Sequence, residues 1–299
     1  MKKEIPVLHV IDGNNFANRA YHAPGKQLKH KGKPIGTVYR FFNMLNKQIK
    51  DHGIKHLAVA FDIPTQDTFR FHMVVDWHTE NNVAFDKEAA YKAGRSKNPV
   101  KRKELPPQIE LIRELCIELG IVTLKGNKKN PYEADDYIGS VAALGNRTMI
   151  HSNDKDFIQL MKDFKVKLQR PKNLLSRSMI KDEYGVEYWQ FLDFLALAGD
   201  SVDNIPHVKG VGSKTIAGLL EQYGSIGMIV KSKDEVKGIM GKALRGEVYC
   251  PDLKLCYKLA KIKIDCPVPK KLSAYKFNRD SNAIRAIKKE YKFQSFLGG

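Results

Sequence analysis

Apolar residues follow two alternating spacings over the first 155 residues. Short apolar runs predict strands at 7–11 and 57–61, and further strands are predicted at 121–124 and 147–151. Apolar residues at helical spacing predict three helices, at 37–50, 107–119 and 134–144. Strand–helix alternation of this kind predicts an α/β fold, with a mostly parallel sheet flanked by helices.

The stretch from about 65 to 103 departs from this alternation. It is rich in charged and polar residues, contains no clear strand, and is too long for an ordinary connection. Long insertions of this kind are commonly lids or binding loops. The pattern becomes helical from about residue 178. We therefore divide the chain into an α/β domain over 1–180, which carries the 65–103 insertion, and a helical region over 181–299.

Charge points to the class of partner. The chain has 51 lysines and arginines against 33 acids, a formal net charge of +18. Such an excess favours a nucleic-acid partner, although a generally soluble basic protein has the same composition. No run of about 18 apolar residues is present, and the start of the chain predicts a strand rather than a signal peptide. The four cysteines lack C-x-x-C spacing, and Cys116 is predicted to be a buried thiol. We expect a monomer in a reducing cytoplasm, in a bacterial cell or a phage-infected host.

Nine acidic side chains stand out at five places in this basic chain, and four of the places directly follow or open a predicted element. The nine are Asp12, Asp62, Glu133, Asp135, Asp136, Asp154, Asp156, Asp200 and Asp203. Ligands of open α/β sheets bind at the carboxyl ends of the strands, where several of these acids fall. Converging carboxylates repel one another unless divalent cations lie between them. The pattern therefore predicts a metal site.

Oxygen-only ligands favour Mg²⁺ or Mn²⁺ over zinc. Two such ions about 4 Å apart activate water and stabilise the entering and leaving oxygens at a phosphorus atom. Acids at the start of a helix can instead serve only to cap it, as the 133–136 run would do alone. Asp154 and Asp156 point the same way at the end of a strand. Taken together with Asp154 and Asp156, the acids of the 133–136 run favour metal ligation. Some of the nine acids would then orient water instead of contacting a metal ion.

A second motif follows the last pair of acids. Gly210 and Gly212 predict a tight turn before a helix over 215–223. Glycines let a backbone approach a phosphate, and free N–H groups at the start of a helix bind it. The turn lies directly after Asp200 and Asp203, which strengthens this interpretation.

These residues together resemble the structure-specific 5′-nuclease family. The family includes bacteriophage 5′-exonucleases, flap endonucleases and the 5′-nuclease domain of bacterial DNA polymerase I. The resemblance is carried by five stretches in the family's order: 10–15, 19–23, 132–136, 152–156 and 199–206. It covers about residues 5 to 225.

The resemblance implies a PIN-like domain with a helical arch, followed by a helix-three-turn-helix element of helix-hairpin-helix type at about 199–225. It implies a 5′-to-3′ exonuclease and flap endonuclease that uses two Mg²⁺ or Mn²⁺ ions and leaves 5′-phosphate products. The family's Tyr-Lys-x-x-Arg arch motif corresponds to Tyr91, Lys92 and Arg95. Lys92 and Arg95 would stabilise charge on the scissile phosphate, with Asp12 and Asp154 as further catalytic residues, and Tyr91 would stack on a base.

The implied DNA-binding residues are Arg19, Arg70, Tyr91, Lys92, Arg95, Lys209, Gly210, Gly212, Ser213, Lys214 and Thr215. A potassium ion at the hairpin would take the carbonyls of Val208 and Val211 and the Ser213 hydroxyl. The sequence departs from the family in two places. It is longer between Arg70 and Tyr91, and His207 stands where the family usually has glycine.

The leading prediction is therefore a stand-alone nuclease for primer or flap removal in replication and repair, with no polymerase domain after residue 299. Its partner would be DNA with a 5′ flap, a 5′ overhang or a nick. Whether the 5′ end is RNA-primed is left open by the sequence. One alternative is a non-catalytic protein that binds DNA junctions on the same fold. Another is a PIN-type nuclease that cleaves RNA. The acids argue against the first alternative, and the hairpin argues against the second.

Overall fold

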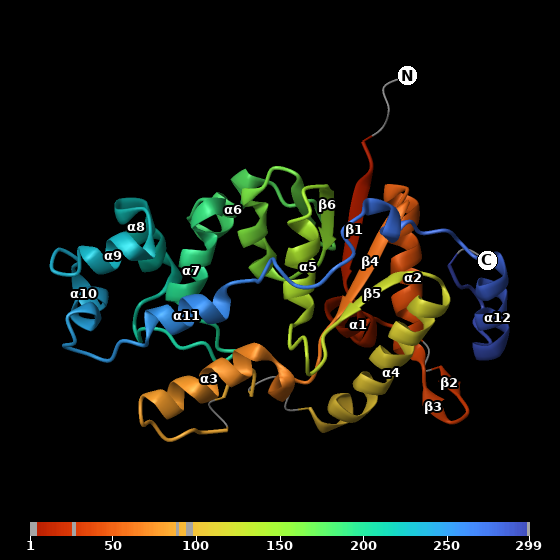
Figure 1. Ribbon diagram of the computed structural model, residues 1–299, viewed down its shortest axis with the longest axis horizontal. Helices are drawn as coiled ribbons and strands as arrows, with labels where there is room; N and C mark the ends of the chain where they lie inside the picture. The colour runs from red at the N-terminus through yellow and green to blue at the C-terminus, as the bar shows by residue number, and fades with distance from the viewer. Residues whose placement is uncertain (1–4, 26–27, 88–89, 94–97, 298–299) are drawn as a thin grey trace.

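Five parallel strands form the centre of the molecule. The computed structural model describes residues 5–25, 28–87, 90–93 and 98–297. The strand order is β5-β4-β1-β6-β7, and every pairing is parallel (Figure 1). The strands are β1 (Val7–Asp12), β4 (His56–Phe61), β5 (Val122–Lys125), β6 (Arg147–His151) and β7 (Val166–Gln169). The first four confirm the predicted strands to within one residue at each end. β7 was not predicted, because its two buried residues alternate with polar ones.

Helices cover both faces of the sheet (Figure 1). On one face, a single apolar cluster joins strand residues to α1 (Gly13–His22), α2 (Gly36–His52) and α4 (Pro99–Glu118). On the other face, a second cluster includes α5 (Ala134–Ala142) and η2 (Lys155–Lys162). This arrangement confirms the predicted α/β class. Cys116 lies fully buried in the first cluster, as predicted.

The helical region packs against the same core as α5. Its elements are α6 (Arg177–Tyr184), η3 (Tyr188–Gln190), α7 (Phe191–Ala198), α8 (Ser213–Tyr223), α9 (Ile226–Lys231), α10 (Gly238–Leu244) and α11 (Leu253–Ala260). Residues from α6, α7, α8, α9 and α10 belong to the cluster that contains β1 and α5. The helical region and the sheet therefore share one continuous core. A helix of the length and apolarity needed to cross a membrane is not found in the described part of the chain.

The end of the chain returns to the α/β part. After η4 (Leu272–Tyr275), helix α12 (Ser281–Tyr291) packs into the cluster of α1, α2 and α4. Phe296 stacks against Phe293 and contacts Phe42 of α2, with ring centroids 5.5 and 4.7 Å apart. The division at residues 180 and 181 stays a prediction, but the described residues after 276 pack away from the other helices of the C-terminal region (Figure 1).

The predicted insertion over 65–103 contains η1 (Thr65–Asp67), α3 (Phe69–Glu80) and the first residues of α4. Tyr91 and Lys92 lie in a turn between α3 and α4 and not on a helix. A short hairpin, β2 (Lys29–His30) and β3 (Lys33–Pro34), separates α1 from α2.

A close backbone contact fixes the start of α1 beside the sheet. A Cβ added to Gly13 would lie 2.5 Å from the Ala60 carbonyl oxygen of β4 and 2.7 Å from the Phe61 ring. Only glycine fits there without displacing β4. Asp12 directly precedes Gly13, so this contact holds the Asp12 carboxylate at the carboxyl edge of the sheet.

Two histidines are buried at the centre of the sheet. His9 Nδ1 lies 2.9 Å from His151 Nε2, and His151 Nδ1 lies 3.0 Å from Gln48 Oε1. Because an amide oxygen only accepts, His151 Nδ1 carries a proton and its Nε2 accepts from His9. Burial, with additional effects of His52 and His56, lowers the pKa of His9 from 6.5 to about 4. Burial also lowers the pKa of His151 well below its usual value.

Acid should therefore destabilise the protein through His9. The unfolded chain binds this proton near pH 6.5 and the folded protein only near pH 4, so the free energy of unfolding falls as the pH falls through that window. Between about pH 8 and about pH 5, we expect the wild type to lose about 2 kcal/mol more than His9→Gln. Chemical denaturation at each pH measures this difference. Exposed His207→Gln is the control and should follow the wild type. Parallel profiles for wild type and His9→Gln would contradict the prediction.

Candidate metal centre and DNA-facing elements

Four carboxylates from different parts of the chain line one cavity at the carboxyl edge of the sheet. Asp12 ends β1, Asp62 follows β4, Asp135 lies in the first turn of α5, and Asp154 precedes η2. The cavity has a volume of about 690 Å³. Other polar residues that line it are Asn14, Asn15, Asn18, Lys92, Lys101 and Ser201. The structure thus brings together four of the nine predicted acids.

Asp12 is held rigidly in this cavity. Its Oδ1 accepts a hydrogen bond from the Asn15 backbone N–H at 2.9 Å, and its Oδ2 accepts one from the Ser152 hydroxyl at 2.7 Å. Burial raises the pKa of Asp12 to about 7, and the neighbouring Asp62 and Asp154 also raise it against these hydrogen bonds. The carboxylate is therefore oriented while its charge is poorly compensated.

Asp62 and Asp135 meet at the start of α5. Asp62 Oδ1 accepts a hydrogen bond from the Ala134 backbone N–H at 3.0 Å, which ties the end of β4 to this helix. Burial raises the pKa of Asp135 well above its usual value, and Asp154, Asp62 and Asp12 raise it further. Lys92 has the opposite effect. The cavity thus concentrates negative charge that a bound cation would stabilise.

Asp156, Asp200 and Asp203 form a second acidic group next to Asp154. The pKa of Asp156 is raised to about 7, mainly by burial. The charge of Asp154 also raises this pKa, and Asp200 and Asp203 raise it to a smaller extent. Lys155 lowers it, with its ammonium 3.5 Å from Asp156 Oδ1 and 2.8 Å from Asp200 Oδ2. Asp200 Oδ1 also accepts hydrogen bonds from the backbone N–H groups of Val202 and Asp203. Asp154 lies between the two groups.

The donor set fits divalent cations. Every acidic ligand is oxygen, and Asp156 Oδ1 is buried with no hydrogen-bond partner among the described residues. Hard cations such as Mg²⁺ and Mn²⁺ take such oxygens. As the side chains stand, no three acids, histidines or cysteines of the described ranges are close enough to hold an ion. Metal binding would therefore draw the carboxylates together.

Glu133 and Asp136 pair with a buried arginine instead of lining the acidic cavity. Both are buried, and Arg70 of α3 lies between them. Arg70 Nη1 donates to Glu133 and to Asp136, each at 2.7 Å, and Nη2 donates to Asp136 at 2.8 Å. The guanidinium also donates to the carbonyls of Leu259 and Lys261. Asp136 Oδ2 completes a capping box with the Glu133 N–H.

These contacts involve three of the predicted site residues, whose roles stay predictions. Glu133 and Asp136 do not line the acidic cavity, because their oxygens are occupied by Arg70 and Lys92. Arg70 does not present its charge to DNA, because only 3% of it is exposed. The three side chains instead join α3 to α5 and to the end of α11.

Tyr91 and Lys92 are folded inward against the same carboxylate. The Tyr91 hydroxyl donates to Glu133 at 3.1 Å, and the Lys92 ammonium pairs with Glu133 Oε1. The Lys92 backbone N–H donates to the Asp203 carbonyl at 2.9 Å, and its φ is +59°. Burial would raise the pKa of Glu133, but Lys92 and Arg70 lower it to about 2. Tyr91 is buried, so its ring is not available for base stacking in this arrangement.

Truncation of Arg70 should have a large effect on stability. Arg70→Ala leaves two carboxylates buried without their main partner, and breaking a buried ion pair in this way typically costs about 3–5 kcal/mol. Arg113→Ala is the matched control, because Arg113 pairs with Glu110 at the surface, where pairs contribute at most about 1 kcal/mol. Denaturant titration of the three proteins tests this. Equal stabilities of the two variants would contradict the buried ion-pair assignment.

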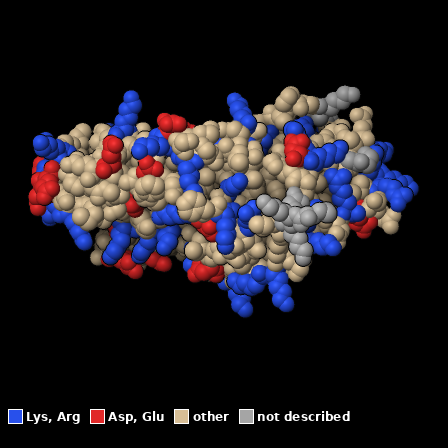
Figure 2. Space-filling model, turned by 90° about the horizontal axis from the view of Figure 1, so that it is seen from above, with Lys and Arg blue, Asp and Glu red and all other residues tan. Residues whose placement is uncertain are grey.

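The other predicted DNA-binding residues lie at the surface or near the cavity. Arg19 is half-buried on α1. Lys209, Gly210, Gly212, Ser213, Lys214 and Thr215 are all exposed. Gly210 has φ +85°, and Gly212 is the N-cap of α8, so the turn before α8 has the predicted geometry. Arg95 lies outside the described residues. Figure 2 shows lysine and arginine side chains along the whole length of one face, with acids in smaller groups.

The structure adds residues to the site that the sequence pattern did not single out. Lys155 pairs with Asp200, Ser152 orients Asp12, and Lys101 lines the acidic cavity. Ser152 and Lys155 lie within the 152–156 motif, so the motif itself was the available signal. Lys101 gave no such signal, because it is one of three consecutive basic residues, 101–103, at the start of α4.

Comparisons with known proteins place the chain in a family. The parallel sheet with the acidic cavity at its carboxyl edge first defines an α/β domain, which a helical region follows. Residues 7–185 match the family model of the 5′-3′ exonuclease N-terminal resolvase-like domain. Residues 186–283 match the model of the 5′-3′ exonuclease C-terminal SAM fold. The chain belongs to the 5′-3′ exonuclease family.

Curated relatives and solved structures agree with this. A 5′-3′ exonuclease of Aquifex aeolicus is 32% identical over 297 residues, which are 97% of this chain and 93% of that protein. The thermostable DNA polymerase I of Thermus aquaticus is 32% identical over 295 residues, 96% of this chain. The chain spans about a third (32%) of the length of that polymerase. A zinc-bound T5 5′-exonuclease has the same fold, with a TM-score of 0.64 at 20% identity, covering 85% of this chain and 88% of that one.

Proposed function

We propose that this protein is a divalent-metal-dependent 5′-to-3′ exonuclease and flap endonuclease. It hydrolyses phosphodiester bonds near 5′ ends at junctions of single- and double-stranded DNA and leaves 5′-phosphate products. The observation that carries this proposal is the cavity lined by Asp12, Asp62, Asp135 and Asp154. Support comes from membership of the exonuclease family and from a T5 flap endonuclease solved with DNA and metal ions, whose fold is similar at a TM-score of 0.61, 16% identity and 97% and 95% coverage.

Acidic and basic residues of the cavity would have different roles in this reaction. The four cavity acids and the group of Asp156, Asp200 and Asp203 would hold two divalent ions, Mg²⁺ or Mn²⁺. When bound, such ions supply Lewis acidity and an activated water. Lys92 and Lys101 line the same cavity and bring positive charge to the phosphate. Arg95 stays a proposed partner of Lys92 in this role.

The exposed turn before α8 would hold the duplex. Its glycines and the first N–H groups of α8 suit a phosphate, and Lys209 and Lys214 add charge. A potassium ion at the carbonyls of Val208 and Val211 and the Ser213 hydroxyl stays part of the proposal. In cells the enzyme would act as a monomer in the cytoplasm on flaps, overhangs or nicks.

Substrate comparison tests the proposed activity. A 3′-labelled single-flap DNA, a blunt duplex and a single strand of equal length are incubated with the protein and Mg²⁺. We expect cutting within a few nucleotides of the junction and much slower cutting of the other two DNAs. The 3′-labelled product should also carry a 5′-phosphate, so that treatment with a phosphatase changes its electrophoretic mobility. Equal rates on all three DNAs would contradict junction specificity, and an unchanged mobility would contradict the product assignment.

A further inference from the structure

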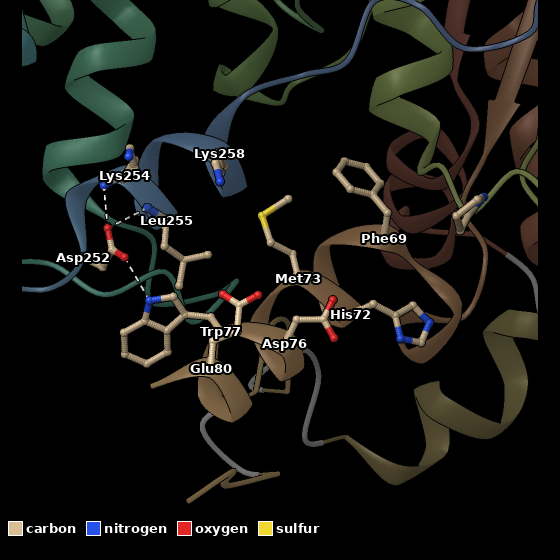
Figure 3. Close-up of a pocket in the computed structure, with 11 residues that line it drawn as sticks. Phe69, His72, Met73, Asp76, Trp77, Glu80, Asp252, Lys254, Leu255 and Lys258 are labelled. Atoms are coloured by element: carbon tan, nitrogen blue, oxygen red, sulfur yellow. Dashed lines mark hydrogen bonds between the residues drawn. The ribbon is translucent and has the colours of Figure 1, made fainter. Parts of the chain in front are cut away.

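A groove runs between α3 and α11. Its volume is about 520 Å³. Phe69, Met73 and Trp77 are spaced four residues apart on α3, so they form one apolar stripe along this helix. Leu255 of α11 faces the stripe (Figure 3). All four side chains are only half-buried, so the stripe is open to a ligand.

Charge is distributed unequally over the two rims of this groove. Lys254 and Lys258 lie one turn apart on α11 and are exposed, whereas Asp76 and Glu80 lie one turn apart on α3 (Figure 3). Asp252 is already engaged. It accepts hydrogen bonds from Trp77 Nε1 at 2.9 Å and from the first backbone N–H groups of α11. This bond fixes the Trp77 indole in place at one end of the groove.

The apolar stripe continues beyond Phe69, at the end of the groove opposite Trp77. The Phe69 and Tyr132 rings have centroids 5.9 Å apart, and the Lys263 ammonium lies 5.8 and 5.7 Å from their centroids. The Phe69 backbone N–H donates to the Pro131 carbonyl at 2.9 Å. Aromatic rings from Trp77 to Tyr132 are thus accompanied by lysines. The series ends beside Glu133, which holds Lys92 of the acidic cavity.

Aromatic rings beside a row of lysines are a common surface for single-stranded nucleic acid. Bases stack on the rings while ammonium groups follow the phosphates, and each stacked base contributes about 1–3 kcal/mol. We propose that the groove between α3 and α11 binds the single-stranded 5′ segment of the DNA substrate. Trp77 and Phe69 stack on its bases, and Lys254 and Lys258 contact its phosphates. This inference rests on the proposed flap endonuclease function.

The acidic rim sets the orientation of the strand. Asp76 and Glu80 repel phosphates, so the backbone lies along α11 and the bases face α3. The groove has room for a short stretch of nucleotides, and its lining includes Pro131, two residues before Glu133. A flap with only one nucleotide would not fill it. The predicted signature is therefore a dependence on flap length.

Trp77 provides a direct reading of stacking. The chain has two tryptophans, so Trp189→Phe leaves Trp77 as the only indole emitter. In EDTA, which prevents cleavage, a DNA with a flap of about ten nucleotides should quench Trp77 emission by at least about a third. A nicked DNA of the same duplex should leave it nearly unchanged. Unchanged emission with a bound long flap would overturn the proposal.

Paired lysine variants give an independent test. Lys254→Ala/Lys258→Ala should raise KM for the long-flap DNA about five-fold or more relative to KM for a one-nucleotide flap. The control is Arg285→Ala/Lys289→Ala, which removes two exposed charges at the same spacing on α12. It should leave the ratio of the two KM values unchanged. Both lysines of the groove are exposed, so the variant should fold, which its thermal midpoint verifies.

The outcomes separate this inference from the proposed function. Normal cleavage of the one-nucleotide flap with no effect of flap length would overturn the groove assignment alone. The groove would then be free for another ligand, such as an amphipathic helix of a partner protein. Absence of cleavage on every DNA would overturn the proposed function, and quenching of Trp77 in EDTA would still report on the groove.

Discussion

Asp135→Asn is expected to lower kcat for flap cleavage by about 10³-fold or more. Asparagine has nearly the same shape, so the change removes one charge from the acidic cavity and little else. Metal ions supply several kcal/mol of transition-state stabilisation, and each 1.36 kcal/mol is a factor of about ten in rate. Single-turnover cleavage of a flap DNA in Mg²⁺ measures the effect. Exposed Asp51→Asn is the control and should cut at the wild-type rate.

The same variant should be at least as stable as the wild type without metal. Neighbouring carboxylates and burial raise the pKa of Asp135 well above its usual value, so its negative charge is unfavourable in the folded protein. Asp136→Asn should behave oppositely, because Asp136 is the main partner of the buried Arg70. Loss of stability in Asp135→Asn, or full activity, would contradict the assignment of Asp135 to the metal centre.

Lys92→Ala is expected to lower kcat by about 10²–10³-fold with little change in the affinity for junction DNA. Lys92 lines the acidic cavity. Of the two basic residues in the arch motif, it is the one that the structure describes. A cation that acts on developing charge lowers kcat when it is removed, whereas a cation used only for binding raises KM. Single-turnover rates and binding in EDTA separate the two effects.

A matched control lies in the same insertion. Exposed Lys87→Ala removes an equal charge between α3 and α4 and should retain the wild-type kcat. Because Lys92 also pairs with buried Glu133, thermal unfolding of Lys92→Ala must accompany the rate measurement. A folded Lys92→Ala with a wild-type rate would remove Lys92 from the catalytic site. A change in KM alone would assign it to binding.

Much of the fold follows from local sequence pattern. Most of the predicted strands are short runs rich in apolar residues, and each predicted helix has an apolar face, so burial favours them. Asp12, Asp62 and Asp154 follow three of these strands, and parallel strands bring their carboxyl ends to one edge. The convergence of these acids could therefore be predicted before any tertiary contact was known.

Other features depend on contacts that spacing does not encode. Glu133, Asp135 and Asp136 lie within four residues at the start of α5, yet only Asp135 lines the cavity. The difference arises because Arg70, more than sixty residues away in the chain, enters from α3 and pairs with the other two. A basic residue near an arch motif gives the same sequence signal whether it contacts DNA or a buried acid. The packing of α12 against the α/β part also depends on such long-range contacts, so the sequence pattern did not predict it.

The central claim is that the acidic cavity is a metal-dependent nuclease site. The most direct measurement is cleavage of a 5′-labelled single-flap DNA with Mg²⁺, with EDTA, and with the Asp154→Asn variant in Mg²⁺. Cuts near the junction in Mg²⁺ that disappear in EDTA and in the variant are the predicted result. Tight binding of the DNA without any cut in Mg²⁺ or Mn²⁺ would contradict it and would indicate a protein that binds DNA junctions without cleaving them.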